Sequence, residues 1–398
     1  MSTASKASQL EQEWPPPLYT FGVPWPEFND GLSYTDVIRP SQNATTLIDF
    51  YYSKYRSSAP LQGWLQRIRN GQITINGIVV ADPQAALSPG SKIIYHRIPW
   101  KEARAPFMLQ VLYEDDDMVA INKPSGLQVL PGGLFQQRTV LTQLQWKASK
   151  QGSICSTGHD VQQPHPVPVH RLGRGTSGIL LCAKTKLAKT TLATYFAEGT
   201  SFVGENRMPG QGFGEARRIS KFYRALVRGI LEYDEILIEQ PIGVVQYPGV
   251  AKGLYVASSS GKPALSKVQV LERDTQQNRT VVQVEIHSGR PHQIRIHLAF
   301  IGHPLVGDPL YQGGGQPNLL ETETIEDSFA EDGGYQKPER PLPGDCGYYL
   351  HAHRLVLCHP SMDKMTEIIA PLPSILQTRQ ESNQIRAAEG MLTYEMAS

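Results

Sequence analysis

The chain has 398 residues, and its 38 Lys and Arg against 37 Asp and Glu leave a net charge of +1. At roughly 100–200 residues per domain, this length allows two or three domains. The neutral balance excludes a globally basic nucleic-acid binder but leaves room for local basic patches. Apolar runs reach about five residues, whereas a membrane-spanning helix needs about 20, so we expect a soluble protein with no membrane partner.

The four cysteines, Cys155, Cys182, Cys346 and Cys358, form no CxxC pair. A chain of this length folds without disulfides, which predicts free, mostly buried thiols in a reducing compartment. The first ten residues carry one basic side chain, Lys6, and no apolar core, so no secretory signal is expected. We therefore expect an intracellular protein. Cytoplasm, nucleus and organelle are not distinguished, although early acidic residues disfavour a transit peptide.

Residues 1–40 are rich in proline and aromatic residues and are expected to form an irregular N-terminal arm. Residues 41–104 read as a small module. A helix around Trp64–Ile68 is expected to stop at Gly71, and the dipeptide Asn76-Gly77 predicts a tight hairpin. From 51 to 104 there are eight Lys and Arg against two acids. This local excess of positive charge is consistent with a phosphate-binding face or with a solvated basic surface, and charge alone does not distinguish the two.

Residues 105–398 are expected to form the second unit, with loop insertions at 201–219 and 313–345. Strands are expected at 119–121, 179–183, 222–230, 281–286, 348–359 and 365–373. The apolar spacing of 186–198 predicts an amphipathic helix that ends at Gly199.

The basic loop at 170–178 contains a literal GxGxxG pattern. A strand follows the glycines instead of a helix, which excludes a dinucleotide fingerprint. What remains is a tight loop suited to a phosphate-rich ligand, or else a structural turn with solvated arginines. Its candidate RNA-binding side chains are His170, Arg171, Arg174, Thr176 and Ser177.

A second motif runs from Ser288 to His297, and Pro291 within it predicts the start of a helix. His292 and Arg295, three residues apart, share one face, and a helix N-terminus with these cations favours an anion. Arg290 belongs to the same basic group. His297 is better explained as a hydrogen-bonded structural imidazole.

A metal site is not expected at the Cys346 to His359 segment. It contains His351, His353 and Cys358, but strand alternation places that cysteine opposite the two histidines, and no ligand pair has zinc-finger spacing.

Together these motifs resemble the RluA-type family of RNA pseudouridine synthases, in the branch found in plants. The matching motifs follow the family's order between Val111 and Pro373. They are Glu114-Asp115-Asp116 before Asn122-Lys123-Pro124-Ser125-Gly126, His170-Arg171-Leu172 with Thr176-Ser177-Gly178, Lys221-Phe222-Tyr223-Arg224-Ala225, Gly261-Lys262-Pro263-Ala264, Gly289-Arg290-Pro291-His292-Gln293-Ile294-Arg295-Ile296-His297, and Gly302-His303-Pro304 through Gly307-Asp308 to Tyr311. Residues 41–104 more weakly resemble the small RNA-binding module, named after a ribosomal protein, that often precedes this domain.

The resemblance implies an α+β fold with a mixed, largely antiparallel central sheet flanked by helices. It also implies a reaction in which a uridine is flipped out of RNA, its N-glycosidic bond breaks, the base rotates and a C–C bond forms. No metal or cofactor is needed. The implied partner is RNA, either tRNA or rRNA, and no obligate protein partner is indicated.

Residue by residue, Tyr223 matches the pocket tyrosine that stacks on the base and Arg295 matches the arginine that pairs with the catalytic carboxylate. Arg171 matches the arginine that displaces the base, and Leu265 loosely matches a pocket packing residue. Further RNA contacts are expected from Lys221, Arg290 and His292, and from Arg67 and Arg69 of the small module.

The sequence departs from the family at the catalytic carboxylate, because Gly173 and Gly175 stand where acids are expected. Arg295 would then need a phosphate, another acid or water as its partner. Two hypotheses follow. An active synthase would use a relocated carboxylate, with Asp160 the nearest upstream acid. A catalytically silent RNA-binding protein or RNA chaperone would keep Tyr223 and the RNA cleft that the resemblance implies across the middle of the sheet.

Overall fold

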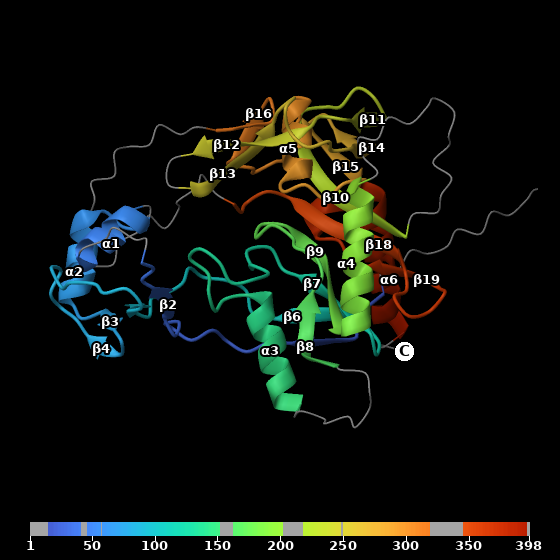
Figure 1. The fold of residues 1–398 in the computed structure, drawn as a ribbon. Coiled ribbons are helices and arrows are strands. Elements are labelled where there is room, and N and C mark those ends of the chain that lie inside the picture. Colours follow the sequence, from blue (N-terminus) through green and yellow to red (C-terminus); the bar gives the residue numbers. More distant parts are fainter. Residues whose placement is uncertain are drawn as a thin grey trace, which may run out of the picture.

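The computed structural model describes residues 15–40, 46–56, 58–151, 162–201, 218–247, 250–318 and 345–395. These residues form a small module with a four-stranded sheet and a larger unit around an 11-stranded sheet. Figure 1 shows the small module, in blue, to one side of the larger unit. None of the helices among the described residues combines the length and apolar character that crossing a bilayer would require.

The small module is an antiparallel sheet covered by two helices. In sheet order its strands are β2 (Leu32–Val37), β5 (Lys92–Arg97), β3 (Ile73–Ile75) and β4 (Ile78–Val79), with helices α1 (Leu47–Lys54) and α2 (Leu61–Arg69). The predicted helix and hairpin are confirmed. Gly71 follows α2 with φ +70°, and both Asn76 and Gly77 adopt the left-handed conformation that a two-residue hairpin turn requires. Aromatic side chains such as Trp64 and Tyr51 fill the core.

The prediction of an irregular arm through residue 40 is wrong for its second half. Strand β1 (Tyr19–Phe21) pairs with β6 (Leu109–Glu114) of the large sheet, and β2 is an edge strand of the small one. Both pairings join segments far apart in the chain, so no local sequence pattern could indicate them. The arm therefore belongs to both sheets, and the sheet of the small module begins before residue 41.

The large sheet is mixed and largely antiparallel, as expected. Its main path runs β1-β6-β7-β9-β18-β10-β15-β14-β11, with β19 beside β18 and β8 beside β9. The bounds are β7 (Met118–Lys123), β8 (Gln162–Pro168), β9 (Ser177–Thr185), β10 (Ile219–Arg228), β11 (Glu235–Ile238), β14 (Ser266–Asp274), β15 (Arg279–Ile286), β18 (Leu350–Cys358) and β19 (Met365–Ile369). The parallel pairing of β9 with β18 joins Ser177 to His351. It brings the starts of both strands, and the segments that lead into them, to the same place.

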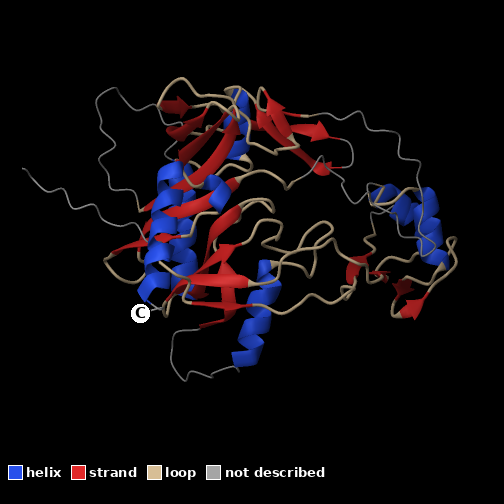
Figure 2. Cartoon of the chain, turned by 180° about the vertical axis from the view of Figure 1, so that it is seen from behind, coloured by secondary structure: helices blue, strands red, loops and turns tan. Residues whose placement is uncertain are grey.

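Helices cover the sheet (Figure 2). These are α3 (Val140–Gln151), α4 (Lys186–Ser201), α5 (Gln293–Phe300) and α6 (Arg379–Glu395), beside a short 3-10 turn (Ser374–Leu376). The predicted helix at 186 is confirmed but continues past Gly199 to Ser201. The α5 helix begins two residues later than predicted, because His292 is its N-cap with φ +56°, a left-handed conformation outside the helical region.

Two small hairpins complete the described fold. They are β12 (Ile242–Tyr247) with β13 (Val250–Ala257), and β16 (Tyr311–Gly313) with β17 (Gln316–Pro317). Most of the two predicted insertions, at 202–217 and 319–344, lies outside the described residues.

Candidate active site

The 170–178 loop is held in place by a buried lysine from β7, the strand that pairs with β9. Lys123, at the end of β7, donates from Nζ to the carbonyl of Arg174 at 3.1 Å and to two carbonyls of its own turn at 2.8 and 2.9 Å. Burial lowers the pKa of Lys123 to about 7. Ser125 of the same turn donates to the carbonyl of Gly175 at 2.7 Å. The Asn-Lys-Pro-Ser-Gly motif therefore fixes the backbone of the basic loop.

The space beside Gly173 is occupied by a tyrosine hydroxyl. A Cβ atom added to Gly173 would lie 3.0 Å from Tyr348 Oη and 3.4 Å from Thr176 Oγ1. Those two oxygens are hydrogen-bonded to each other at 3.2 Å, and both side chains are buried. A side chain at position 173 would crowd the hydroxyl of Tyr348, which would have to shift by a few tenths of an ångström. The sequence analysis did not identify Tyr348.

Gly175 has no room for any side chain. Its Cβ would lie 2.7 Å from the carbonyl oxygen of Asp345 and 2.8 Å from ring carbons of Tyr348. The backbone N–H of Gly175 donates to the same Asp345 carbonyl at 3.1 Å. The chain from 345 to 348 thus lies directly against both glycines of the loop.

Arg295 has an acidic partner, which answers the question that the sequence left open. Its Nε and Nη2 atoms donate to the two carboxylate oxygens of Asp308, both at 2.7 Å. The side chains are only 3% and 0% exposed. Although burial acts to lower it, this pairing holds the pKa of Arg295 above its usual value. The guanidinium lies 4.3 Å from the centre of the Tyr348 ring, so Arg295 is adjacent to the loop through that ring.

A second arginine–aspartate pair lies on the loop itself. Arg174 Nε donates to Asp345 Oδ2 at 2.8 Å, and Nη2 donates to Oδ1. These side chains are 21% and 40% exposed. Burial acts to raise the pKa of the Asp345 carboxyl, but Arg174 outweighs it and the pKa lies below its usual value. The sequence predicted Arg174 as a phosphate ligand, whereas its charge is balanced by a carboxylate in this structure.

Tyr223 shares a hydrophobic cluster with this loop. It lies on β10 between Ala352 of β18 and Val284 of β15. Its ring is buried in a cluster that also contains Leu172 of the loop and Tyr348. Burial raises the pKa of Tyr223, so its hydroxyl is protonated at neutral pH. The structure therefore brings Tyr223 beside the 170–178 loop, and it adds Tyr348, which lies in none of the predicted motifs.

His170 and Lys221 both contact helix α4 through Phe196. His170 accepts a hydrogen bond from the Leu181 amide at 3.0 Å and stacks on Phe196, with ring centres 4.5 Å apart. Burial lowers the pKa of His170 to about 3, so the imidazole is neutral and carries no charge for phosphate. Lys221 Nζ lies 5.4 Å from the Phe196 ring centre.

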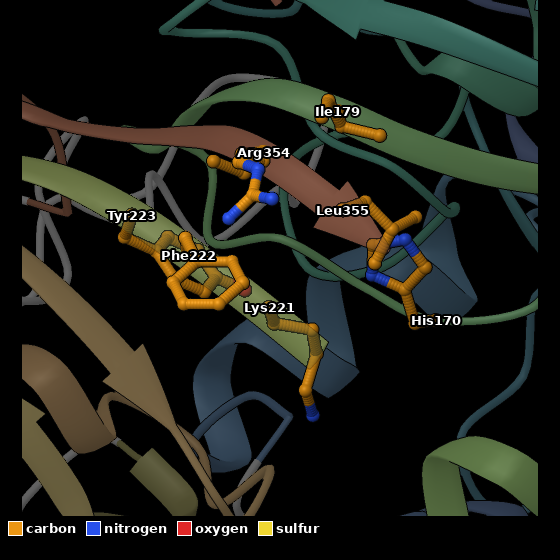
Figure 3. A pocket seen from close by; sticks show the side chains of 8 residues that line it. His170, Ile179, Lys221, Phe222, Tyr223, Arg354 and Leu355 are labelled. Atoms are coloured by element: carbon orange, nitrogen blue, oxygen red, sulfur yellow. The ribbon is translucent and has the colours of Figure 1, made fainter. Parts of the chain in front are cut away.

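A small cavity lies between these residues and Tyr223. Figure 3 shows Lys221 extending away from the other labelled side chains that line it. The volume of about 10 Å³ admits about one water molecule and no nucleobase.

The two hydroxyls of the loop form hydrogen bonds within the protein. Thr176 bonds to Tyr348, and Ser177 Oγ lies 2.8 Å from Nδ1 of His351. Arg171 is exposed. Of the five side chains predicted to bind RNA from this loop, Arg171 is therefore the cation that extends into solvent.

His292 and Arg290 differ in their surroundings. His292 Nδ1 lies 2.9 Å from the Tyr311 hydroxyl, and burial lowers its pKa to about 3. It is therefore neutral, contrary to the expected cation. Arg290 is half-buried and donates to the Pro263 carbonyl at 3.0 Å. It lines a hollow of about 370 Å³ with Tyr255 and Lys262.

Two further residues are structural. His297 is buried, with hydrogen bonds to Ser266 and to the Gln240 carbonyl, which confirms its expected role. Leu265 is half-buried, and its amide donates to Ser288 Oγ at 3.1 Å.

Arg67 and Arg69 of the small module differ in burial. Arg67 is buried, with its guanidinium 4.7 Å from the Trp64 ring centre and 5.1 Å from that of Tyr95. Its prediction as an RNA contact is wrong, because an arginine in the aromatic core does not reach phosphate. Arg69, two residues on, is exposed. The 3.6-residue helical period separates the two side chains.

The histidines near Cys358 each have a protein partner. His353 Nδ1 lies 2.8 Å from the Ala370 carbonyl, and His359 Nε2 lies 2.8 Å from Asp115 Oδ2. Over the part of the chain that the structure describes, no three His, Cys, Asp or Glu side chains are arranged to hold a metal ion. Asp160 lies outside the described residues.

Comparison with known proteins places this arrangement in a family. The model of the family described as RNA pseudouridylate synthase matches residues 117–300. RNA pseudouridine synthase 5 of Oryza sativa subsp. japonica is 64% identical over 389 residues, which covers 96% of this chain and 98% of the rice protein. RNA pseudouridine synthase 5 of Arabidopsis thaliana is 63% identical, over 92% of this chain and all of its own.

A more distant relative is ribosomal large subunit pseudouridine synthase D of Pseudomonas aeruginosa, 30% identical over 80% of this chain and 84% of its own. The chain therefore belongs to the RNA pseudouridylate synthase family. The rice and Arabidopsis relatives support the plant branch that its motifs indicate.

Proposed function

We propose that the protein is an RNA pseudouridine synthase, which isomerises uridine to pseudouridine in RNA. The observation that carries this proposal is the 64% identity to a plant pseudouridine synthase over nearly the whole of both chains. The silent RNA-binding alternative is not favoured by any comparison.

The reaction rearranges one nucleoside without a co-substrate. The N1–C1′ bond of uridine breaks, the uracil turns, and a C5–C1′ bond forms. The hydrogen on C5 leaves as a proton and N1 gains one, so atoms and charge balance. The target base must leave its stack before C1′ can be reached. The exposure of Arg171 supports a role for it in displacing the base, and Tyr223 lies in the core beside the same loop.

Gly173 is proposed to occupy the place of the family's catalytic aspartate. The chain continues from His170-Arg171-Leu172 and resumes the family pattern at Thr176-Ser177-Gly178. Glycine offers neither nucleophile nor base, so this protein needs a carboxylate from another segment if it turns over.

The RNA target is proposed to be tRNA or rRNA. The name of the Pseudomonas aeruginosa relative, a large ribosomal subunit pseudouridine synthase, supports ribosomal RNA as the first class to test. The small module, with its basic balance and exposed Arg69, supplies a surface for RNA outside the cleft.

The test is release of tritium from uridine C5. Unmodified large-subunit rRNA and tRNA transcripts, tritiated at C5 of every uridine, are incubated with the purified protein. We expect tritium in the water and one pseudouridine for each tritium released. RNA that is bound but retains all of its tritium in both transcripts would contradict the proposed function.

A further inference from the structure

The reacting uridine requires a carboxylate that positions 173 and 175 lack. Breaking the N1–C1′ bond leaves electron deficiency at C1′, which an ionised oxygen stabilises or captures. This step belongs to the proposed function, and the inference below rests on it. Among the described residues, two carboxylates contact the arginines of the two basic motifs: Asp308 with Arg295, and Asp345 with Arg174.

Asp308 is closed to substrate. Its side chain is completely buried. Besides the two bonds from Arg295, its Oδ1 accepts from the amides of Leu310 and Tyr311, at 2.9 and 3.1 Å. A carboxylate with four donors and no exposed surface cannot attack a nucleoside. It fixes Arg295 and the start of β16.

Asp345 is open to substrate. Its side chain is 40% exposed, and its carboxylate is oriented by the paired nitrogens of Arg174. Its own carbonyl is bound to the Gly175 amide, so the residue lies within one hydrogen bond of the loop. Arg174, and to a lesser degree Arg295, lower the pKa of this carboxyl despite its partial burial, which keeps it ionised.

The 345–348 segment also leaves no room for a side chain at Gly175 and crowds one at Gly173. The Asp345 carbonyl and the Tyr348 ring lie where a side chain on Gly175 would begin, and the Tyr348 hydroxyl lies where one on Gly173 would extend. The same segment that excludes side chains from the loop brings its own carboxylate to it.

We propose that Asp345 is the catalytic carboxylate of this protein, delivered from the segment before β18 and oriented by Arg174. In this proposal the carboxylate lies on the segment that packs against the loop, and not on the loop itself. The carboxylate is still paired with an arginine, but that arginine, Arg174, belongs to the loop.

The step balances as follows. An Asp345 carboxylate oxygen forms a bond to C1′ while the C1′–N1 bond breaks. The electron pair of the C1′–N1 bond leaves with the uracil, which becomes an anion. The uracil turns beside C1′, and C5 then attacks C1′ while the C1′–O bond breaks and the electron pair of that bond returns to the carboxylate. The proton on C5 leaves to solvent, and N1 takes a proton from solvent.

The experiment is single-turnover tritium release by Asp345→Asn in the full-length protein. Asparagine keeps the backbone bond to Gly175 and nearly the same volume, so the loop stays in place. We expect release to fall by at least about 10³-fold, in the range seen when a covalent nucleophile is removed. Affinity for the transcript should be unchanged or slightly higher, because a negative charge leaves the phosphate path.

The matched control is Asp234→Asn. Asp234 forms another solvent-exposed pair, accepting from Arg273 Nη2 at 2.7 Å, and its side chain is 82% exposed. This variant makes the same substitution beside β11, at the end of the large sheet remote from β9, and we expect release at the wild-type rate. In the Asp345→Asn background, Gly173→Asp with Tyr348→Phe restores an acid to the loop and removes the hydroxyl in its way. Returned release would support the proposal.

The outcomes separate the two claims. A silent wild-type protein overturns the proposed function itself. An active wild type with equally active Asp345→Asn overturns only the role of Asp345. Loss of release together with loss of RNA affinity in Asp345→Asn also overturns it, because Asp345 would then be a positioning residue for RNA.

Discussion

Two arginine–aspartate pairs flank the same tyrosine, yet their burial gives them different roles. Arg295 and Asp308 are almost completely buried, whereas Arg174 and Asp345 are 21% and 40% exposed. Both arginines bind both carboxylate oxygens through Nε and Nη2. A buried pair is costly to break but unreachable, and an exposed pair adds little stability but can meet a ligand. The two pairs thus have similar geometry, but the buried pair with Asp308 stabilises the fold, and the exposed pair with Asp345 is the one proposed to act in catalysis.

The largest effect is expected at the buried pair. Asp308→Asn leaves Arg295 as an uncompensated buried cation, which costs about 3–5 kcal/mol of unfolding free energy. Urea denaturation followed by circular dichroism measures it. Asp345→Asn is the comparison, and its cost is at most about 1 kcal/mol because the pair is partly exposed. Equal losses in the two variants would remove the distinction between the pairs.

The pH dependence of stability gives a second test, because it reports on buried groups and not on the exposed Asp345 pair. The pKa values of His170, His292 and His351 are all lowered by burial to about 3, from about 6.5 in the unfolded chain. The unfolded state therefore binds more protons below pH 6.5, and stability is lost as pH falls from there toward 3. We expect a loss of about 1 kcal/mol for each histidine between pH 7 and 5.5.

The Asp345 pair should not contribute to this loss. Its pKa is lowered, so the contribution of this carboxylate is present above the unfolded value near 3.9 and is lost only below it. Wild type and Asp345→Asn should therefore lose stability in parallel between pH 7 and 5.5 in urea titrations. Stability independent of pH across this range would show that the histidines are not held neutral.

The contact between the loop and the 345–348 segment predicts a smaller steric effect. Gly175→Ala places a methyl group 2.7 Å from the Asp345 carbonyl, and overpacking of this kind costs about 1–3 kcal/mol. Tritium release should fall as well, because the displaced carbonyl belongs to Asp345. Gly313→Ala is the matched control, since its added methyl meets nothing within 4 Å. Indistinguishable thermal melting of the two variants would contradict the packing described.

The smallest expected effect separates exposed from buried arginines in RNA binding. Arg171→Ala removes one solvent-facing cation, and we expect affinity to fall about 3- to 10-fold and the salt slope by about 1. Arg67→Ala, from the aromatic core of the module, should lower stability instead and leave the salt slope unchanged. Fluorescence anisotropy over a potassium chloride series measures both. A changed slope for Arg67→Ala would return that residue to the RNA interface.

Local patterns predicted those parts of the fold that depend on neighbouring residues. The Asn76-Gly77 hairpin follows from turn chemistry, and the helix from Lys186 follows from apolar spacing. The arm strands were missed because β1 and β2 form only by pairing with distant segments. Burial was missed for Arg67 and His170, since one sequence does not show which side of a charged segment faces the core.

The site was predictable as a set of motifs but not as a geometry. Asp308 lies 13 residues after Arg295 and within a quoted motif, so a search for nearby acids would have found this partner. Asp345 lies 171 residues after Arg174, beyond a segment that reads as a surface loop. Only the parallel pairing of β9 with β18 brings those segments together. No spacing rule in the sequence encodes that contact.

The most direct test of the account is a single turnover with protein in excess over C5-tritiated RNA. We predict that the wild type releases the tritium of its target uridine completely. In the same time Asp345→Asn should release none while it holds the RNA with wild-type affinity. Equal release by both proteins would contradict the catalytic role of Asp345. The Arg174–Asp345 pair would then have a structural role only, like the Arg295–Asp308 pair.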